Sequence, residues 1–565
     1  MSKVAIISLA WILTLNSLFG FVPSALGSWS AGIDLQRFTI QKDGRLGPSF
    51  LNQTQAGWFQ QASGDPVYGV YFGFFTILSG AVDLKQSLQI LQLLPPSLIL
   101  LAATSLAAAR QFEYIGRQGF RRITPFLPLL FLLPIGRMHV MILGYAGNAL
   151  ASAIVMLLLW LLLRVSFVPQ GSSRIVAIVI LLTFVLVYTY HTWSTYFAIF
   201  AAVVFLWNGL FRHLRKRPTI RVSRLLIFAP VAWLFAAFYG ANQALLSRFV
   251  DAVTVLRTAS PIERPIGLYL RGAGGPLENY LRVVPILSVA HAPTLAALAV
   301  FVVLVTGSTL ILVAPKEKRR SSRIGDYGLS MAIGSAATVP ALFALGGVDL
   351  ALSRGFEFLS VTGPFVIASA LVSVTHQSRP LLERSTKTDL TISRNRSGNF
   401  LTVLVSAFLV LSVLASALDV YELSHDELLS SAEASAVSTL SERTSVQTKI
   451  WSDHRIAAAF LDHQPKAFLT FDVAYERDLE ARAVLAVFYN PNCEIAAQYL
   501  KGTGAQIAIT TEYMRTQGVV QRTGPLVPAP EAFACFDRSA SRVYSNGAVV
   551  AYDLNSMFAL YATGA

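Results

Sequence analysis

The stretch LLTFVLVYTYHTWSTYFAIFAAVVFLWNGLF, Leu181 to Phe211, runs directly into the basic segment RHLRKRPTIRVSR, Arg212 to Arg224. The hydrocarbon core of a bilayer is about 30 Å thick, and roughly 20 apolar residues in a helix cross it. Lipid offers no partners to backbone N–H and C=O groups, so an apolar segment that crosses it is helical. Basic segments beside a span are retained on the cytoplasmic side. This junction therefore indicates membrane-spanning helix and gives its orientation.

Apolar runs of this kind recur along most of the chain. Val4 to Val22 and Phe400 to Leu418 are two further examples. The composition agrees, with 54% hydrophobic residues, 13% charged residues and a mean hydropathy of +0.56. We predict an α-helical polytopic membrane protein with about 11 transmembrane helices, followed by a polar tail.

The Lys and Arg residues are concentrated in four segments, each separated from the next by an even number of expected spans. They lie at 110–122, 212–224, 316–323 and 379–396, after the second, sixth, eighth and tenth spans. Basic loops stay cytoplasmic and Lys3 precedes the first span, so the N-terminus is expected inside and the C-terminus outside. The formal net charge of +14 is therefore mainly a topology signal. Its division among short loops disfavours nucleic acid as a partner.

The first apolar run has a second interpretation. Lys3, the run itself and Ala25-Leu26-Gly27 also fit a secretory signal with its cleavage site. An apolar run of about 18 residues is long for a signal peptide, which favours an uncleaved span. Cleavage would leave the orientation of every later span unchanged.

The composition changes sharply near residue 419. Residues 1–419 form the expected membrane body, and residues 420–565 form a tail long enough for one globular domain. The alternation of helix and strand patterns predicts a small external α/β domain. The expected elements are a helix at 425–461, strands at 467–473, 483–489 and 506–510, and a hairpin within 542–554 whose turn, Asn546-Gly547, requires positive φ.

Both cysteines of the chain, Cys493 and Cys535, lie in this tail. The external face of a membrane is oxidising, which permits a disulfide between them. Chance placement of two cysteines is the alternative. Neither residue belongs to a recognisable metal-binding motif.

The first external loop, residues 23–66, carries two carboxylates of interest. Asp34 lies just beyond the first span, and Asp65 opens the segment DPVYGVYFGFFTILSG. That segment is too short to span the bilayer before the polar DLKQS, so residues 66–82 are expected to form an interfacial helix. Asp65 also suits a helix cap, and Asp34 also suits a cap or a solvated loop position.

Three basic or titratable residues lie near the expected external ends of spans. Arg137 and His139 fall at the end of the third span, and His191 falls near the end of the fifth. Such groups at membrane depth are functional candidates, and we expect them to line an active cavity. A hydrogen bond to a loop carbonyl is the alternative for each.

The loop is followed by a Pro/Tyr-led interfacial segment that ends in Leu-Ser-Gly, and then by a span that ends in Arg. This order resembles the C-type superfamily of membrane glycosyltransferases. The residues at the family's loop positions are Gly32, Asp34, Gly44, Asp65, Pro66 and Tyr68. The external loop GGVDLALSRGFEF, expected between the ninth and tenth spans, and the tail segments SDHRIAAAF and RVYSNGAVVAYDL are also similar to members of this superfamily.

The resemblance implies transfer of a hexosyl or pentosyl group from a polyprenyl-phosphate donor to an acceptor glycan, lipid or protein outside the cytoplasmic membrane of a prokaryote. It implies that Asp34, with Asp65 as second candidate, takes the acceptor proton in a single inverting displacement. Arg354 and Arg137 are expected at the donor phosphate, which a guanidinium neutralises well. Snorkelling to lipid head groups is the alternative for Arg354.

The resemblance also allows a divalent metal, Mg²⁺ or Mn²⁺. Asp34, Asp43 and Asp65 are oxygen donors of the type that a hard cation accepts, but their spacing matches no recognisable motif. Many members carry an Asp-Glu or Asp-x-x-x-His element in this loop, whereas Asp34 is followed by LQRF. The sequence therefore leaves the metal unknown.

Two other functions remain in competition. A transporter or flippase for a lipid-linked or anionic substrate would typically place charges in mid-span and show an inverted repeat. The expected spans have almost no charge at their centres, and the two halves do not resemble each other. A non-enzymatic envelope scaffold would tolerate replacement of Asp34.

Overall fold

The structure is a computed structural model of the 565-residue chain. In the membrane body it describes residues 96–115, 130–131, 146–167, 172–189, 191–215, 225–238, 292–313 and 323–377, with isolated positions between 404 and 411. In the tail it describes most of residues 429–561. The first apolar run, the first external loop and the interfacial helix lie outside the described residues.

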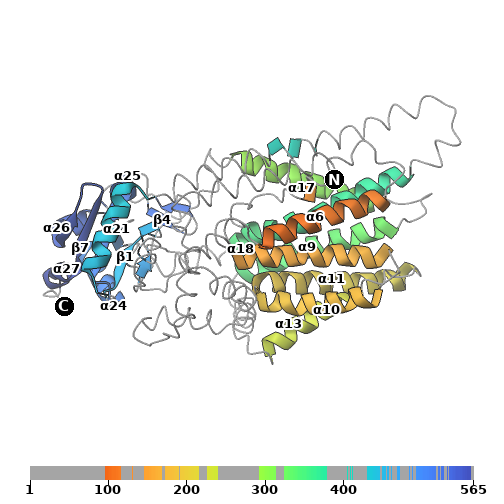
Figure 1. The fold of residues 1–565 in the computed structure, drawn as a ribbon, viewed down its shortest axis with the longest axis horizontal. Coiled ribbons are helices and arrows are strands. Elements are labelled where there is room, and N and C mark those ends of the chain that lie inside the picture. The colour runs from red at the N-terminus through yellow and green to blue at the C-terminus, as the bar shows by residue number, and fades with distance from the viewer. Residues whose placement is uncertain are drawn as a thin grey trace.

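Long apolar helices run side by side to form the body (Figure 1). Their bounds are α6 Pro96–Ile115, α9 Ala146–Phe167, α10 Ser172–Thr189, α11 His191–Arg215, α13 Phe228–Phe238, α17 Ala292–Val313 and α18 Arg323–Gln377. The quoted run Leu181 to Phe211 therefore belongs to two helices, which only residue 190 separates. Among the described residues, the windows Leu150–Phe167 and Trp193–Leu210 are long and apolar enough to cross a bilayer.

Helix α18 folds back on itself. The Ser335 hydroxyl lies 2.8 Å from that of Thr362, 27 residues further on, whereas a straight helix would separate them by about 40 Å. A Cβ atom on Gly328 would lie 2.3 Å from the Cβ of Ser369. Both pairs are symmetric about the bond between residues 348 and 349. We call residues 323–348 the first leg and residues 349–377 the second leg, and we call the end at which the two legs join, residues 346–358, the tip.

The directions of the helices around α18 follow from their contacts. Phe200 of α11 lies beside Gly334 of the first leg, and Asn208 of α11 accepts a hydrogen bond from Ser330. α11 and the first leg are therefore antiparallel. The start of α11 lies near the tip, beside Phe358, so the first leg runs toward the tip. Gly363 of the second leg would place a Cβ 2.5 Å from the ring of Phe301 in α17. The basic segments 212–224, 316–323 and 379–396 thus follow helix ends that lie opposite the tip.

The tail contains a five-stranded mixed sheet in the order β2-β1-β3-β7-β6. The strands are β1 Ile450–Ser452, β2 Phe468–Thr470, β3 Ile507–Thr511, β6 Ser541–Ser545 and β7 Val549–Asp553, and a separate pair is β4 Val519–Gln521 with β5 Gly524–Leu526. β1 is parallel to β2 and β3, whereas β7 is antiparallel to β3 and β6. The helices are α21 Ser431–Arg443, α24 Cys493–Thr503, α25 Glu512–Thr516, α26 Ala534–Ser539 and α27 Leu554–Tyr561.

Two of the expected elements of the tail are wrong. The helix expected at 425–461 ends at Arg443, and the chain then forms β1 with all three residues buried. Its Ile-Trp pair suits a buried strand better than a helix, and tertiary packing decides. In the stretch 483–489, expected as a strand, Ala483, Ala486 and Val487 are helical. The strands expected at 467–473 and 506–510 are confirmed by β2 and β3.

The hairpin of β6 and β7 is also confirmed. Gly547 has a φ of 88°, which costs glycine little. The side-chain oxygen of Asn546 accepts hydrogen bonds from the backbone N–H groups of Ala548 and Val549. The backbone N–H of Asn546 donates to the Val549 carbonyl, so residues 547 and 548 are the two central positions of the turn and Asn546 precedes them.

A disulfide joins Cys493 at the start of α24 to Cys535 in α26, which decides between the two alternatives that the sequence left open. It lies beside a core in which Trp451 and Tyr552 both pack on the ring of Phe536. The tail therefore has a hydrophobic core of its own, stapled between two of its helices.

Candidate functional site

Four of the predicted site residues, Asp34, Asp65, Arg137 and His139, lie outside the described residues. The other two lie on described helices. His191 is the first residue of α11, and Arg354 lies in the second leg of α18, six residues past residue 348. The segment GGVDLALSRGFEF, expected as a loop, is helical throughout and forms the tip.

The helices that carry His191 and Arg354 pack against each other near the tip. The ring of Phe358 lies 5.7 Å from that of Trp193 and 6.0 Å from that of Tyr196, centroid to centroid. His191 precedes Trp193 by two residues, and Arg354 precedes Phe358 by one helical turn. The fold therefore brings these two candidate positions to the same end of the helix bundle.

The aromatic contact is part of a buried cluster of rings. Trp193, Tyr196 and Phe358 each expose 2% or less of their surface. Phe200 extends the cluster one turn further, 5.6 Å from Phe358. The Tyr196–Phe358 and Phe200–Phe358 pairs are edge to face, and such pairs add about 0.5–1.5 kcal/mol each beyond their burial. The cluster fixes the start of α11 against the second leg.

Glu357 is a further candidate that the sequence analysis did not select. It exposes 6% of its surface, and it is the one Asp, Glu, Lys or Arg among the buried residues of the described bundle helices. It follows Arg354 by three residues, a spacing that puts both positions on one side of a helix. A carboxylate in an apolar bundle is costly and is usually kept for a function. Its sequence signal was an acidic residue inside the otherwise apolar run FEFLSVTGPFVIASALVSV.

The neighbouring helix α13 is tied to the same end. The indole N–H of Trp233 in α13 donates a hydrogen bond of 2.9 Å to the hydroxyl of Thr195 in α11. Within a membrane the hydrophobic effect does not drive helices together, so hydrogen bonds between helices contribute to their association. The start of α11 is thus held on one side by α13 and on another by the second leg.

The described residues alone do not form a metal site, because no group of three or more His, Cys, Asp or Glu side chains converges among them. Asp34, Asp43 and Asp65, the oxygen donors named above, lie in the part of the chain that is not described. Two positions near the tip, Arg354 and Glu357, thus contribute a basic and an acidic residue type to this end of the bundle.

No protein-family model matches the chain, and no curated protein matches it in sequence. Among solved structures, the apo oligosaccharyltransferase of Archaeoglobus fulgidus matches with a TM-score of 0.54 and 12% identity, over 97% of this chain and 74% of that chain. The chain has the fold of the C-type membrane glycosyltransferases. The same oligosaccharyltransferase tethered to an acceptor peptide with the NVT sequon gives a TM-score of 0.51 and 12% identity, over 96% of this chain and 74% of that one.

A further structure, ArnT from Cupriavidus metallidurans bound to undecaprenyl phosphate, matches with a TM-score of 0.45 and 11% identity, over 97% of each chain. The C-type fold covers the bundle and the tail together, because the matches extend over nearly the whole chain. The resemblance stated from the order of the sequence features is therefore confirmed at the level of fold.

Proposed function

We propose that the chain is a membrane glycosyltransferase that uses a polyprenyl-phosphate sugar donor and an acceptor outside a prokaryotic cytoplasmic membrane. The observation that carries this proposal is the C-type fold over 97% of the chain, shared with an oligosaccharyltransferase. The acceptor is a glycan, a lipid or a protein, and the group transferred is a hexosyl or pentosyl unit. The tail forms an external domain, because one expected span, Phe400 to Leu418, separates it from the basic segment 379–396, which stays cytoplasmic.

The site is proposed at the end of the bundle that carries the tip. Arg354 supplies a guanidinium to the donor phosphate, with Arg137 as the second candidate. His139 and His191 line the cavity. Support comes from the packing of α11 on the second leg, which brings the positions of His191 and Arg354 to one end of the bundle.

The chemistry is a single displacement at the anomeric carbon. Asp34, with Asp65 as second candidate, accepts the proton of the acceptor nucleophile as the new glycosidic bond forms. The bond to the polyprenyl phosphate breaks on the opposite side, so the configuration inverts. The positive charge of Arg354 stabilises the departing phosphate, whose negative charge grows in the transition state.

A divalent cation, Mg²⁺ or Mn²⁺, is allowed by the residue types of the first external loop, although the spacing of its carboxylates matches no recognisable motif. Asp34, Asp43 and Asp65 would hold it through carboxylate oxygens. Such a cation supplies charge stabilisation to a phosphate leaving group.

The test is transfer of radiolabelled sugar from a mixed polyprenyl-phosphate donor pool to membrane acceptors. Asp34→Asn should abolish transfer while the protein inserts normally. Glu278→Gln, a matched carboxylate change in the long loop after the seventh expected span, should leave transfer intact. Arg354→Lys should lose activity too, because a point charge replaces the bidentate fork. No transfer by wild type, with acceptors shown competent, would favour transport or a scaffold instead.

A further inference from the structure

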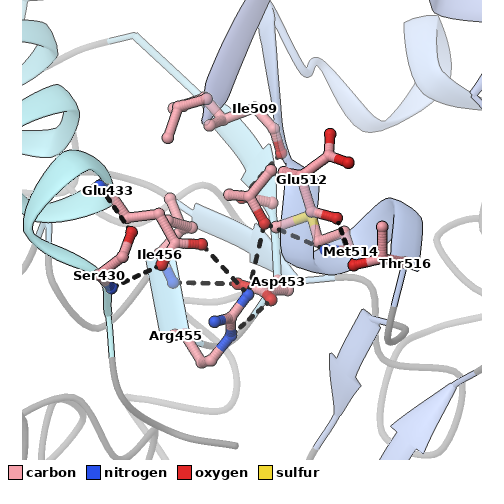
Figure 2. A network of polar contacts seen from close by, with 12 residues as sticks. Ser430, Glu433, Asp453, Arg455, Ile456, Ile509, Glu512, Met514 and Thr516 are labelled. Carbon is pink, nitrogen blue, oxygen red and sulfur yellow. Dashed lines mark hydrogen bonds and ion pairs between the residues drawn. The ribbon is translucent and has the colours of Figure 1, made fainter. Parts of the chain in front are cut away.

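The tail contains a buried ionic cluster that the proposed transfer chemistry does not use. Figure 2 shows Glu433 and Asp453 approaching Arg455 from different elements. Glu433 lies on α21, while Asp453 and Arg455 follow directly after β1. The side chains of Glu433, Asp453 and Arg455 expose 5%, 0% and 1% of their surface. We call these three residues the latch cluster.

Arg455 is the centre of the latch cluster. Its Nε donates a hydrogen bond of 3.0 Å to Oδ2 of Asp453, and its Nη2 lies 3.6 Å from Oε1 of Glu433. The same Nη2 donates to the Thr511 hydroxyl at the end of β3, and the guanidinium stacks 3.9 Å from the ring centroid of Tyr513. Arg455 thus connects the chain after β1 to α21 and to the β3–α25 junction.

The two carboxylates are held differently. Asp453 accepts a second hydrogen bond, 3.0 Å long, from the backbone N–H of Ile456. Glu433 uses its Oε2 in a capping box with Ser430 at the start of α21. Its Oε1 has no hydrogen-bond partner among the described residues, apart from the longer ion-pair contact to Arg455. The link from α21 to the sheet through this cluster is therefore the weaker one.

The charges of the latch cluster do not balance when both carboxylates are ionised. Among the described residues, one guanidinium faces two carboxylates, which leaves one negative charge at these buried side chains. Lys449, at the opposite end of β1, donates to the Thr503 carbonyl instead. An unbalanced buried charge is costly, and buried groups take up a proton to avoid it. A proton from solvent on Asp453 would make the cluster neutral while Glu433 keeps its cap.

We propose that the latch cluster is a proton-dependent fastening that holds α21 on the sheet while it carries a proton and loosens as the external pH rises. Loss of the proton places two carboxylate charges around Arg455, and the longer contact to Glu433 is the one that gives way. α21 follows the last apolar run, Phe400 to Leu418, by about a dozen residues. Its release would lengthen the connection between that run and the sheet.

The sign of the dependence agrees with the surroundings of Asp453. Burial raises the pKa of Asp453 above its ordinary value of 3.8, Arg455 and the Ile456 N–H act to lower it, and Glu433 acts to raise it. A group whose pKa is raised by folding adds stability that is present below 3.8 and is lost as the pH rises through the folded pKa. Acid should therefore tighten the latch, in contrast to an ordinary ion pair.

Hydrogen exchange of the full chain in detergent tests this, with α24 as internal reference and correction for the intrinsic pH dependence of exchange. In wild type, the opening constant of α21 should increase about tenfold per pH unit between 3.8 and the folded pKa of Asp453, and then stay level. Asp453→Asn should show a level profile, with α21 at neutral pH as protected as in wild type or better. Glu442→Gln, an exposed change on the same helix, should match wild type.

Protection of α21 that falls on acidification in wild type would overturn the proposal. So would a level wild-type profile, because it would mean that no proton is held. Reduced protection of α21 at neutral pH in Asp453→Asn, with Glu442→Gln unchanged, would show that the ionised pair is the fastening. Where Asp453→Asn does not fold, the sign of the wild-type profile decides alone. Neither outcome depends on sugar transfer, so the latch and the proposed enzyme stand or fall separately.

Discussion

The hydroxyl of Ser335 donates a 2.8 Å hydrogen bond to that of Thr362 across 27 residues of one helical element. This bond, with the close approach of Gly328 to Ser369, makes α18 a hairpin of two antiparallel legs. The hairpin sets the position of the candidate site, because its tip carries Arg354 and, one turn deeper, the buried Glu357. Small side chains at the contact let the legs approach closely, as is common between membrane helices.

Gly328→Ala should destabilise the bundle. The added methyl group would lie 2.3 Å from the Cβ of Ser369, which cannot turn away, so the two legs must separate. Overpacking of this kind costs about 1–3 kcal/mol. Thermal unfolding in detergent measures the effect. Gly307→Ala in α17, where a Cβ meets nothing within 4 Å, should be neutral or slightly stabilising. Equal effects of the two changes would contradict the close contact of the legs.

The hairpin shows which features of the fold can be predicted from the sequence. Apolar helices and basic segments follow from composition, and the region around Arg354, expected as a loop between two spans, lies where the two legs of α18 join. That this region is helix rather than loop does not follow, because it depends on the contacts between the legs. In the tail, the Asn546-Gly547 signal is local and succeeds. The β1 strand depends on its neighbours β2 and β3, so the helical pattern over 425–461 concealed it.

The residues of the candidate site also differ in whether the sequence or only the structure identifies them. Asp34 and Arg354 are recognisable because they occupy positions in an ordered family pattern. Glu357 is not, because an acidic residue near the end of an expected span looks like an ordinary boundary residue. Its place inside an apolar run is a weak signal, and its burial, with 6% of its surface exposed, is what separates it from an ordinary boundary residue. The same holds for Arg455, whose buried position between two carboxylates depends on the packing of α21.

Glu357→Gln should separate stability from activity. The amide keeps the shape and the hydrogen-bonding capacity of the side chain, so the unfolding temperature should change little. If the carboxylate serves the proposed site, sugar transfer should fall by about tenfold or more, a loss of about 1.4 kcal/mol in transition-state stabilisation. Thermal unfolding and the transfer assay on one preparation give both values. A joint fall of stability and transfer would assign Glu357 a structural role.

Reduction of the Cys493–Cys535 disulfide should destabilise the tail without affecting the bundle. The bond closes a loop with a sequence separation of 42 residues, and loops of this size typically contribute about 2–4 kcal/mol. Hydrogen exchange with and without reductant should show faster opening in α24 and α26 and no change in α9 or α11. The double variant Cys493→Ser, Cys535→Ser should match the reduced wild type and be insensitive to reductant. Unchanged exchange in α24 after verified reduction would contradict this expectation.

Two arginines on one carboxylate offer a matched comparison. Arg515 donates to Asp537 and to the Tyr552 hydroxyl, and it lies over the ring of Phe533, whereas Arg542 makes one hydrogen bond to Asp537. The side chain of Arg542 is 59% exposed and that of Arg515 is 28% exposed. Arg515→Ala should therefore cost about 1–2 kcal/mol of tail stability, and Arg542→Ala under about 0.5 kcal/mol. Equal losses in chemical unfolding would contradict this ranking.

The pH dependence of the tail should change sign near pH 3.8. Burial acts to raise the pKa of Asp537, but hydrogen bonds from Tyr552 and Arg515 and the charge of Arg515 outweigh it and hold that pKa below 3.8. Its contribution is present above 3.8 and is lost as the pH falls through the folded pKa. Asp453 has a raised pKa, so its contribution grows as the pH falls toward 3.8. The pH range in which Asp537 loses its contribution lies below 3.8, and the range in which Asp453 loses its contribution lies above 3.8. Wild type should therefore be most stable near pH 3.8. In unfolding measured across this range, Asp537→Asn should remove the decline on the acid side only, and Asp453→Asn the decline on the other side only. A single variant that removes both declines would show that the two carboxylates titrate together.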